Sequence, residues 1–227
     1  MFTPAYCNLY FGGMKTTTRA GALILCLSFA LMSFAQVPFT DPESEVVSSK
    51  HIQRLKDGVL LVRLESNQKK FETITKALDR ASNPKDSLAW AMELEDTMIE
   101  TAQRQYTITD AVSEEYRFSD VAYFMDFDTR AILDRTKNPL KADLKTEVTL
   151  DSDKPVYILF HGHTPESKID GYVILNSNLN NIPRPFPNNV STSGLAALFG
   201  NDYTHIRRLN GKLFKYYQKV MSSQEGN

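Results

Sequence analysis

Short, continuous apolar runs recur along this chain and are typical of buried β-strands. There are four such runs, each bounded by glycine, proline or polar residues: Val59–Leu64, Val121–Met125, Val156–Phe160 and Tyr172–Leu175. The last two flank a loop rich in proline, glycine and charge, which predicts a hairpin. The runs together predict a sheet.

Apolar residues at intervals of three and four predict helices between the first two strands. The first covers Phe71 to Ala81, with Ser66 as its N-cap. The second runs from about Asp86 to Tyr106, and a shorter helical piece, Thr109–Tyr116, follows after a bend. The apolar stripe of the second helix consists of Leu88, Met92, Ile99, Ala102 and Tyr106, with Ala91 and Met98 beside it. Glu93, Glu95, Asp96 and Glu100 lie mainly toward the solvated side, so the pattern predicts that the apolar stripe packs against the protein.

The last strong pattern is a helix from about Tyr203 to Ser222. Its apolar stripe comprises Ile206, Leu209, Leu213, Tyr217 and Val220, and the opposite side carries Arg208, Lys212, Lys215 and Lys219. No acidic residue lies between Tyr203 and Ser223. The cations indicate either a surface for an anionic partner or the solvated side of a helix that packs on the sheet, and the aromatic bulk favours packing.

The order of elements predicts an α/β or α+β domain, in which helices pack on a mixed sheet of about four to six strands. A long amphipathic helix closes the domain. Residues 130–153 are expected to form a short helix and a polar connection. The proline-rich segment Ile182–Pro187 is expected to run extended across the surface, where Phe186 is a candidate anchor for a partner.

The N-terminal region predicts a secretory signal peptide over residues 14–35. Lys15 and Arg19 precede an apolar run, Ala20–Met32, and small residues stand at Ser33 and Ala35, before Gln36. The run is shorter than the roughly 20 apolar residues of a spanning helix, although a retained membrane anchor is the alternative. Residues 1–13 form an upstream extension, 36–50 a flexible leader, 51–222 one globular domain and 223–227 a tail.

Removal of the predicted signal peptide would change the composition of the chain and exclude thiol chemistry. Cys7 and Cys26 would both be removed, so the remaining 192 residues would have neither disulfides nor thiols. Cleavage also removes Lys15 and Arg19, which changes the formal net charge from −1 to −3. An acidic, exported chain argues against nucleic acid as a partner.

His161 and His163 are the candidate metal ligands. They stand two residues apart at the end of a predicted strand, so their side chains point the same way and can reach one divalent ion. Asp170, Glu166 and His205 are the candidates for a third ligand. The competing interpretation is that a hairpin loop tolerates two histidines.

Other motifs are incomplete. Asp126 and Asp128 follow a predicted strand, as in phosphatases with an aspartate pair, but no later acidic pair completes a magnesium site. Ser66-x-x-Lys69 and Ser82-x-x-Lys85 lack the companion segments of penicillin-binding enzymes. His161-Gly162 has no Gly-x-Ser-x-Gly nucleophile turn to accompany it.

Four segments carry a resemblance to a known group of proteins. They are Asp57–Leu64, Tyr157–Gly162, Gly171–Leu175 and Arg184–Pro187. With this pattern, residues 51–220 resemble a set of uncharacterised exported proteins of Bacteroidota-type bacteria. The resemblance implies an exported Gram-negative context, periplasmic or extracellular, and a compact domain without an assigned activity.

These observations favour a non-catalytic binding or envelope-associated domain with no cofactor. Its candidate binding residues are Phe186, Arg208, Lys212, Lys215 and Lys219, which would contact an anionic envelope component or a protein. The alternative is a metal-assisted hydrolase that uses His161 and His163 with a divalent metal. After cleavage, no transmembrane span is expected.

Overall fold

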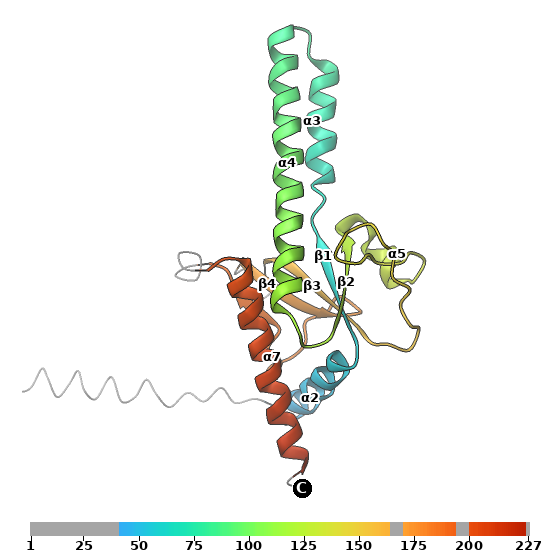
Figure 1. Cartoon of the computed structure of the whole chain (residues 1–227), viewed down its shortest axis with the longest axis vertical. Helices are drawn as coiled ribbons and strands as arrows, with labels where there is room; N and C mark the ends of the chain where they lie inside the picture. Colours follow the sequence, from blue (N-terminus) through green and yellow to red (C-terminus); the bar gives the residue numbers. More distant parts are fainter. Residues whose placement is uncertain (1–40, 164–169, 194–199, 226–227) are drawn as a thin grey trace, which may run out of the picture. The chain divides into compact units, whose positions relative to one another are not determined.

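The computed structural model describes residues 41–163, 170–193 and 200–225, which belong to one compact unit, Asp41–Asn227 (Figure 1). The predicted upstream extension, the signal peptide and residues 36–40 of the leader lie outside the described residues. The described part is an α+β fold, which confirms the predicted class.

A five-stranded mixed sheet lies at the centre of this unit. Its strands are β1 (Val59–Leu64), β2 (Asp120–Met125), β3 (Val156–His163), β4 (Asp170–Asn176) and β5 (Asn189–Ser191), in the order β2-β1-β3-β4-β5. β1 pairs in parallel with β2 and β3, whereas β4 is antiparallel to both β3 and β5. The four predicted strands and the β3–β4 hairpin are confirmed, and β5 is an additional short strand.

Both faces of the sheet are covered by apolar packing. Alternate residues of a strand point to opposite faces. Leu60 and Val62 therefore join a large cluster with helices α2 (Pro42–Lys56), α4 (Pro84–Glu115) and α7 (Asp202–Glu225), while Val59 and Leu61 join a smaller one with α5 (Thr129–Leu133). Figure 1 shows α4 and α7 side by side on one side of the sheet. The apolar runs are continuous because β1 is buried on both faces.

The domain begins with helix α2 (Pro42–Lys56), where the sequence predicted a flexible leader. That prediction was wrong over residues 42–50. Asp41 caps the helix by accepting a hydrogen bond from the Glu43 amide, and proline occupies the first helical position. Ser48 is fully buried and donates to the Pro183 carbonyl at 2.7 Å, which fixes the helix to the domain.

Helices α3 (Gln68–Arg80) and α4 (Pro84–Glu115) form an antiparallel hairpin. α4 is one helix of 32 residues, so the predicted bend between two shorter helices was wrong. Ser66 is not the N-cap of α3, since Asn67 occupies that position. At 1.5 Å per residue α4 is roughly 48 Å long, and its first half extends with α3 beyond the sheet (Figure 1).

We call α3 and residues 84–101 of α4 the arm. Within it, Ile74 is buried and Lys70 Nζ lies 3.2 Å from Glu93 Oε1 of α4. Asn67 Nδ2 donates to Thr101 Oγ1 at 2.8 Å, which closes the base of the arm. These contacts identify the face of α4 that packs on α3.

The remaining helices are α5 (Thr129–Leu133), which confirms the predicted short helix, and α7 (Asp202–Glu225). α7 confirms the long C-terminal helix, although residues 223–225 of the predicted tail are helical too. Its buried residues include Ile206, Leu209 and Leu213. Among residues 41–225, as far as they are described, no helix is long and apolar enough to cross a membrane.

Candidate functional site

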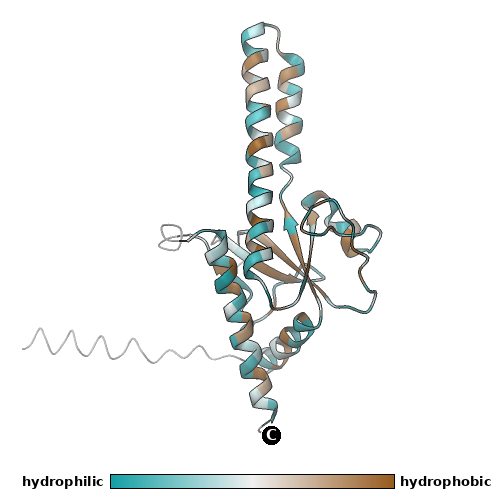
Figure 2. Cartoon of the chain, in the orientation of Figure 1, coloured by the Kyte–Doolittle hydropathy of each residue, from teal (hydrophilic) through white to brown (hydrophobic). Residues whose placement is uncertain are grey.

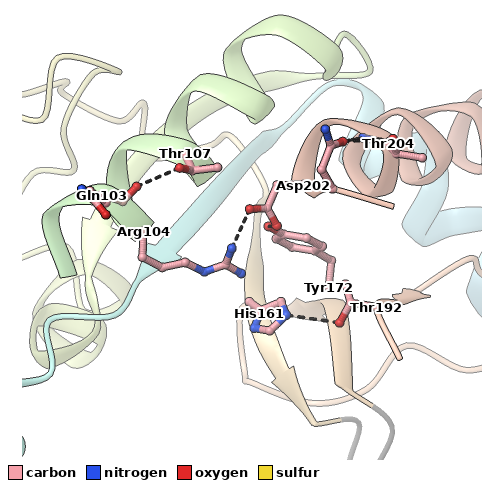
Figure 3. A network of polar contacts seen from close by, with 9 residues as sticks. Gln103, Arg104, Thr107, His161, Tyr172, Thr192, Asp202 and Thr204 are labelled. Carbon is pink, nitrogen blue, oxygen red and sulfur yellow. Dashed lines mark hydrogen bonds and ion pairs between the residues drawn. The ribbon is translucent and has the colours of Figure 1, made fainter. Parts of the chain in front are cut away.

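A network of polar side chains joins α4, α7 and the sheet at the base of the arm (Figure 3). Arg104 of α4 places Nη1 2.5 Å from Oδ2 of Asp202, the first residue of α7. Tyr172 of β4 donates its hydroxyl to the other oxygen, Asp202 Oδ1, also at 2.5 Å. One carboxylate therefore binds two elements that lie far apart in sequence.

The network continues to His161 on β3. The imidazole stands edge-on to the Tyr172 ring, with centroids 5.2 Å apart, and its Nε2 lies 3.3 Å from Thr192 Oγ1. Burial, together with the charge of Arg104, lowers the pKa of His161. Burial and the hydrogen bond to Asp202 raise the pKa of Tyr172. At neutral pH the network therefore holds a neutral imidazole and a protonated phenol.

His161 and His163 lie on the same face of β3, as predicted, but each has its own partner. His163 Nε2 lies 3.1 Å from Oδ1 of Asp170, the residue opposite it on β4. His205 is buried in α7, and Glu166 lies outside the described residues. Over the described ranges, no three His, Cys, Asp or Glu side chains are grouped to hold a metal ion.

Asp126 and Asp128 both have structural partners at the end of β2. Ser66 donates to Asp126 Oδ1 through its hydroxyl at 2.5 Å and its amide at 3.2 Å. Lys137 Nζ lies 2.6 Å from Asp128 Oδ2. The first aspartate ties the turn after β1 to the end of β2, in keeping with the structural interpretation of an aspartate pair that follows a strand.

Phe186 is a core residue, which corrects its prediction as an exposed anchor. Its side chain is 2% exposed and packs edge-on against Tyr216 of α7, with ring centroids 6.5 Å apart. Ile182 of the same segment is also buried. The proline-rich segment is therefore anchored in the core by Ile182 and Phe186, while Arg184 is exposed, so the Phe186 side chain is not available to a partner.

The basic side of α7 has the predicted placement. The stripe of Ile206, Leu209, Leu213 and Val220 is buried, while Tyr217 is only half-buried and Tyr216 takes its place in the core. All four cations of the opposite side, Arg208, Lys212, Lys215 and Lys219, are exposed.

Two of these cations already have partners. Lys212 donates to the Asn189 carbonyl at 3.2 Å, and Lys219 Nζ lies 3.4 Å from Glu45 Oε1 of α2. Within the described part of the chain, Arg208 and Lys215 form no ion pair. Their role as binding residues stays a prediction.

The apolar stripe of α4 is exposed, although the amphipathic pattern predicted a face packed against the protein. The exposed fractions are 63% for Leu88, 57% for Met92, 58% for Met98, 48% for Ile99 and 69% for Tyr106. Trp90, also on α4, is 41% exposed. Figure 2 shows brown, apolar segments continuing along the arm away from the sheet.

This exposed stripe lies opposite α3. At about 100° per residue, Leu88, Met92, Ile99, Ala102 and Tyr106 average roughly 160° around α4 from Thr97 and Thr101. The two threonines are buried, and Thr101 accepts the hydrogen bond from Asn67 beside α3. We call the five residues the outer stripe. It is an apolar surface that is exposed along the arm, and at the end nearer the sheet Ala102 and Tyr106 line a pocket with Ala142, Asp143 and Leu144.

Sequence reasoning did not select the members of the polar network, Arg104, Tyr172 and Asp202. No local signal marks them, because 30 residues separate Tyr172 from Asp202 and 98 separate Arg104 from Asp202. The outer stripe, by contrast, was visible as a pattern. What the sequence lacked was any sign that the stripe faces away from the domain.

The comparisons with known proteins leave the predicted resemblance to exported bacterial proteins untested. No protein-family model, no curated protein and no solved structure matches this chain.

Proposed function

We propose that this protein is an exported, non-catalytic binding domain whose arm presents the outer stripe of α4 to another polypeptide. The observation that carries the proposal is the exposure of Leu88, Met92, Ile99 and Tyr106 along one face of a projecting helix. Contiguous exposed apolar surface of this kind marks interaction sites in proteins.

The construction of the arm supports a role in contact with a partner. The buried side of α4 in the arm is lined partly by threonines, Thr97 and Thr101, and α3 contributes Ile74 as its fully packed apolar residue. Leu88, Met92 and Ile99 lie on the opposite, exposed side of α4. A helix gains no stability within the isolated domain from an apolar face that stays in water.

Support for export comes from residues 14–35, where a basic start, an apolar run and small residues precede Gln36. Support for a non-catalytic role comes from the partners of the candidate catalytic groups. Asp126, Asp128 and His163 each bind a neighbouring side chain, and His161 lies within the network around Asp202.

Site-specific photo-crosslinking in the producing cells tests the proposal. A benzoylphenylalanine at Ile99 is expected to give a discrete adduct with another polypeptide, because Ile99 lies in the middle of the outer stripe. The matched control is the same group at Thr75, an exposed position of α3, which is expected to give none. Absence of adducts from Met92, Ile99 and Tyr106 alike would remove the outer stripe as the binding surface.

The basic side of α7 is a second candidate surface, favoured by the exposure of Arg208 and Lys215 without an ion pair in the described part of the chain. It would bind an anionic envelope component. Reversing both charges, with Arg208→Glu and Lys215→Glu, is expected to abolish sedimentation with anionic vesicles or anionic cell-wall polymer. Unchanged sedimentation would leave these residues as the solvated side of an ordinary helix.

A further inference from the structure

The outer stripe has the spacing of a coiled-coil seam. Going along α4 from Leu88, the residues on this face are Leu88, Met92, Glu95, Ile99, Ala102 and Tyr106, so the intervals alternate strictly between four and three. This alternation is the heptad pattern by which one helix packs along another. The seam spans 18 residue steps, roughly 27 Å at 1.5 Å each, which a helix of about 20 residues covers.

An acid interrupts the seam and a second acid flanks it. Glu95 occupies a seam position, Asp96 is exposed at the edge of the seam, and Glu100 is exposed farther round the helix. None of these three carboxylates forms a salt bridge or hydrogen bond with a described residue. Glu93 differs, because Lys70 of α3 pairs with it.

No cation on this face balances those acids. Between Leu88 and Tyr106 the sequence has one basic residue, Arg104, and its guanidinium is held by Asp202 at the base of the arm. A helix that packs on the seam brings its own side chains against Glu95 as the apolar contacts exclude water. A carboxylate in such a place calls for an opposite charge, because a desolvated carboxylate without a partner is strongly unfavourable.

We propose that the occupant of the outer stripe is a cationic amphipathic helix of another protein, which packs along α4 with a lysine or arginine opposite Glu95 and a further cation beside Asp96. This rests on the proposed function and names the chemistry of the partner. The paired charge at one seam position fixes the register of the two helices. The apolar positions supply the contact area.

Charge disfavours two other occupants of this surface. A second copy of the chain, packed antiparallel about the middle of the seam, brings Glu95 and Asp96 of both copies together without a cation. An anionic lipid surface meets the same three carboxylates and is repelled. Both occupants are outcomes of the test.

Two designed peptides of about 20 residues test the proposal on the full-length protein. Both have leucines at seam positions. The cationic peptide has lysine at the seam position opposite Glu95 and at the flanking positions, and the anionic peptide has glutamate at each of those places. Fluorescence anisotropy of the labelled peptides is expected to show the cationic peptide binding about tenfold or more tightly than the anionic one.

Three variants of the protein separate the contributions. Ile99→Glu is expected to weaken the cationic peptide by about tenfold or more, because it places a charge in the seam. Thr75→Glu adds the same charge on α3 and is expected to change nothing. The triple variant Glu95→Gln, Asp96→Asn, Glu100→Gln removes the negative charges. It is expected to bind the cationic and the anionic peptide with similar affinity. Circular dichroism confirms that each variant is folded.

Each other result overturns the inference. Equal binding of both peptides, sensitive to Ile99→Glu, would mean that the partner is not cationic, while the proposed function stands. Concentration-dependent dimers that Ile99→Glu dissociates would make a second copy the occupant, and sedimentation with anionic vesicles that depends on Ile99 would make it a membrane. If neither peptide binds, a helix is the wrong occupant, and crosslinking at Ile99 decides the proposed function separately.

Discussion

Arg104 and Asp202 form the ion pair that joins the long helix of the arm to the first turn of α7, with 2.5 Å between Nη1 and Oδ2. The side chain of Asp202 is 10% exposed, and its second oxygen accepts the Tyr172 hydroxyl. Three elements therefore share one carboxylate. The Asp202 carboxylate therefore adds to the apolar packing that holds α4 against α7 and β4 at the base of the arm.

Replacing Asp202 by asparagine tests how much this carboxylate contributes to the stability of the domain. The amide keeps an acceptor for Tyr172 but removes the countercharge of Arg104, so we expect the free energy of unfolding to fall by about 1–3 kcal/mol. Urea denaturation followed by far-UV circular dichroism measures it. Asp134→Asn is the control, because its pair with Arg130 is well exposed, and the midpoint should not move. An equal midpoint for both variants would show that the contacts of Asp202 do not stabilise the domain.

Substitution by alanine at Gly58 and at Gly211 is expected to change the stability of the domain in opposite directions. A Cβ at Gly58 would lie 2.4 Å from the Pro155 carbonyl oxygen and 2.7 Å from that of Arg54, both of them backbone atoms. Gly58→Ala is therefore expected to destabilise the domain by about 1–3 kcal/mol.

Gly211 lies in α7 with nothing within 4 Å of its added Cβ. Gly211→Ala should stabilise by about 0.5–1 kcal/mol, since alanine favours the helix. Thermal unfolding of the two variants beside the parent measures both changes. A gain in stability from Gly58→Ala would contradict the close approach between α2, β1 and the segment before β3.

Stability is expected to fall as the pH drops below about 6.5. Burial lowers the pKa of His51, His161 and His205 below the ordinary value of 6.5. The unfolded chain therefore takes up protons at a pH where the folded chain does not, and unfolding becomes easier from about pH 6.5 down to the lower folded pKa values. Above that window, these groups are neutral in both states and contribute no pH dependence.

Urea unfolding at about pH 7.5 and pH 5.5 measures this dependence, since the window lies between them. His161→Gln should reduce the difference in the free energy of unfolding between the two pH values, because one of the three imidazoles with a lowered pKa is then missing. A protein equally stable at both pH values would contradict the burial of the imidazoles.

Metal content separates the binding domain from the alternative hydrolase. His163 pairs with Asp170 and His161 with Thr192, so we expect the purified protein to contain zinc, manganese and iron far below one equivalent. Elemental analysis measures this, with the double variant His161→Ala, His163→Ala as the baseline. Stoichiometric metal that disappears in the double variant would favour the hydrolase.

The sheet was predictable from sequence because its strands are buried on both faces. Residues of β1 and β3 form continuous apolar runs, which a strand needs when helices or loops cover each side. β5 was missed because three residues, Asn189–Ser191, with one buried valine among them, carry no run.

The helix boundaries were predicted less well, for identifiable reasons. α2 buries only Ser48, Ile52 and Leu55, so its apolar stripe is weak. A signal that could have indicated α2 is its charge pattern. Glu43 lies in the first turn and Lys56 in the last, which is the order that the helix dipole favours. The unbroken length of α4 was hidden by β-branched residues near Thr107, which have lower helix propensity.

The candidate sites show what an amphipathic pattern can and cannot determine. For α7 the pattern identified a buried face and an exposed one. For α4 an equally clear stripe was taken for a buried face, yet Leu88 and Met92 are exposed. Periodicity identifies the apolar side of a helix, but whether anything covers it depends on how far the helix extends past the sheet.

The position of the single tryptophan has a practical consequence for anyone studying this protein. Trp90 lies in the distal part of α4, away from the sheet and its two apolar clusters. Its emission spectrum is thus a local reporter of the distal part of the arm, while ellipticity averages over every helix. Melting curves recorded by the two signals would coincide only if the arm and the rest of the domain unfold in a single cooperative transition.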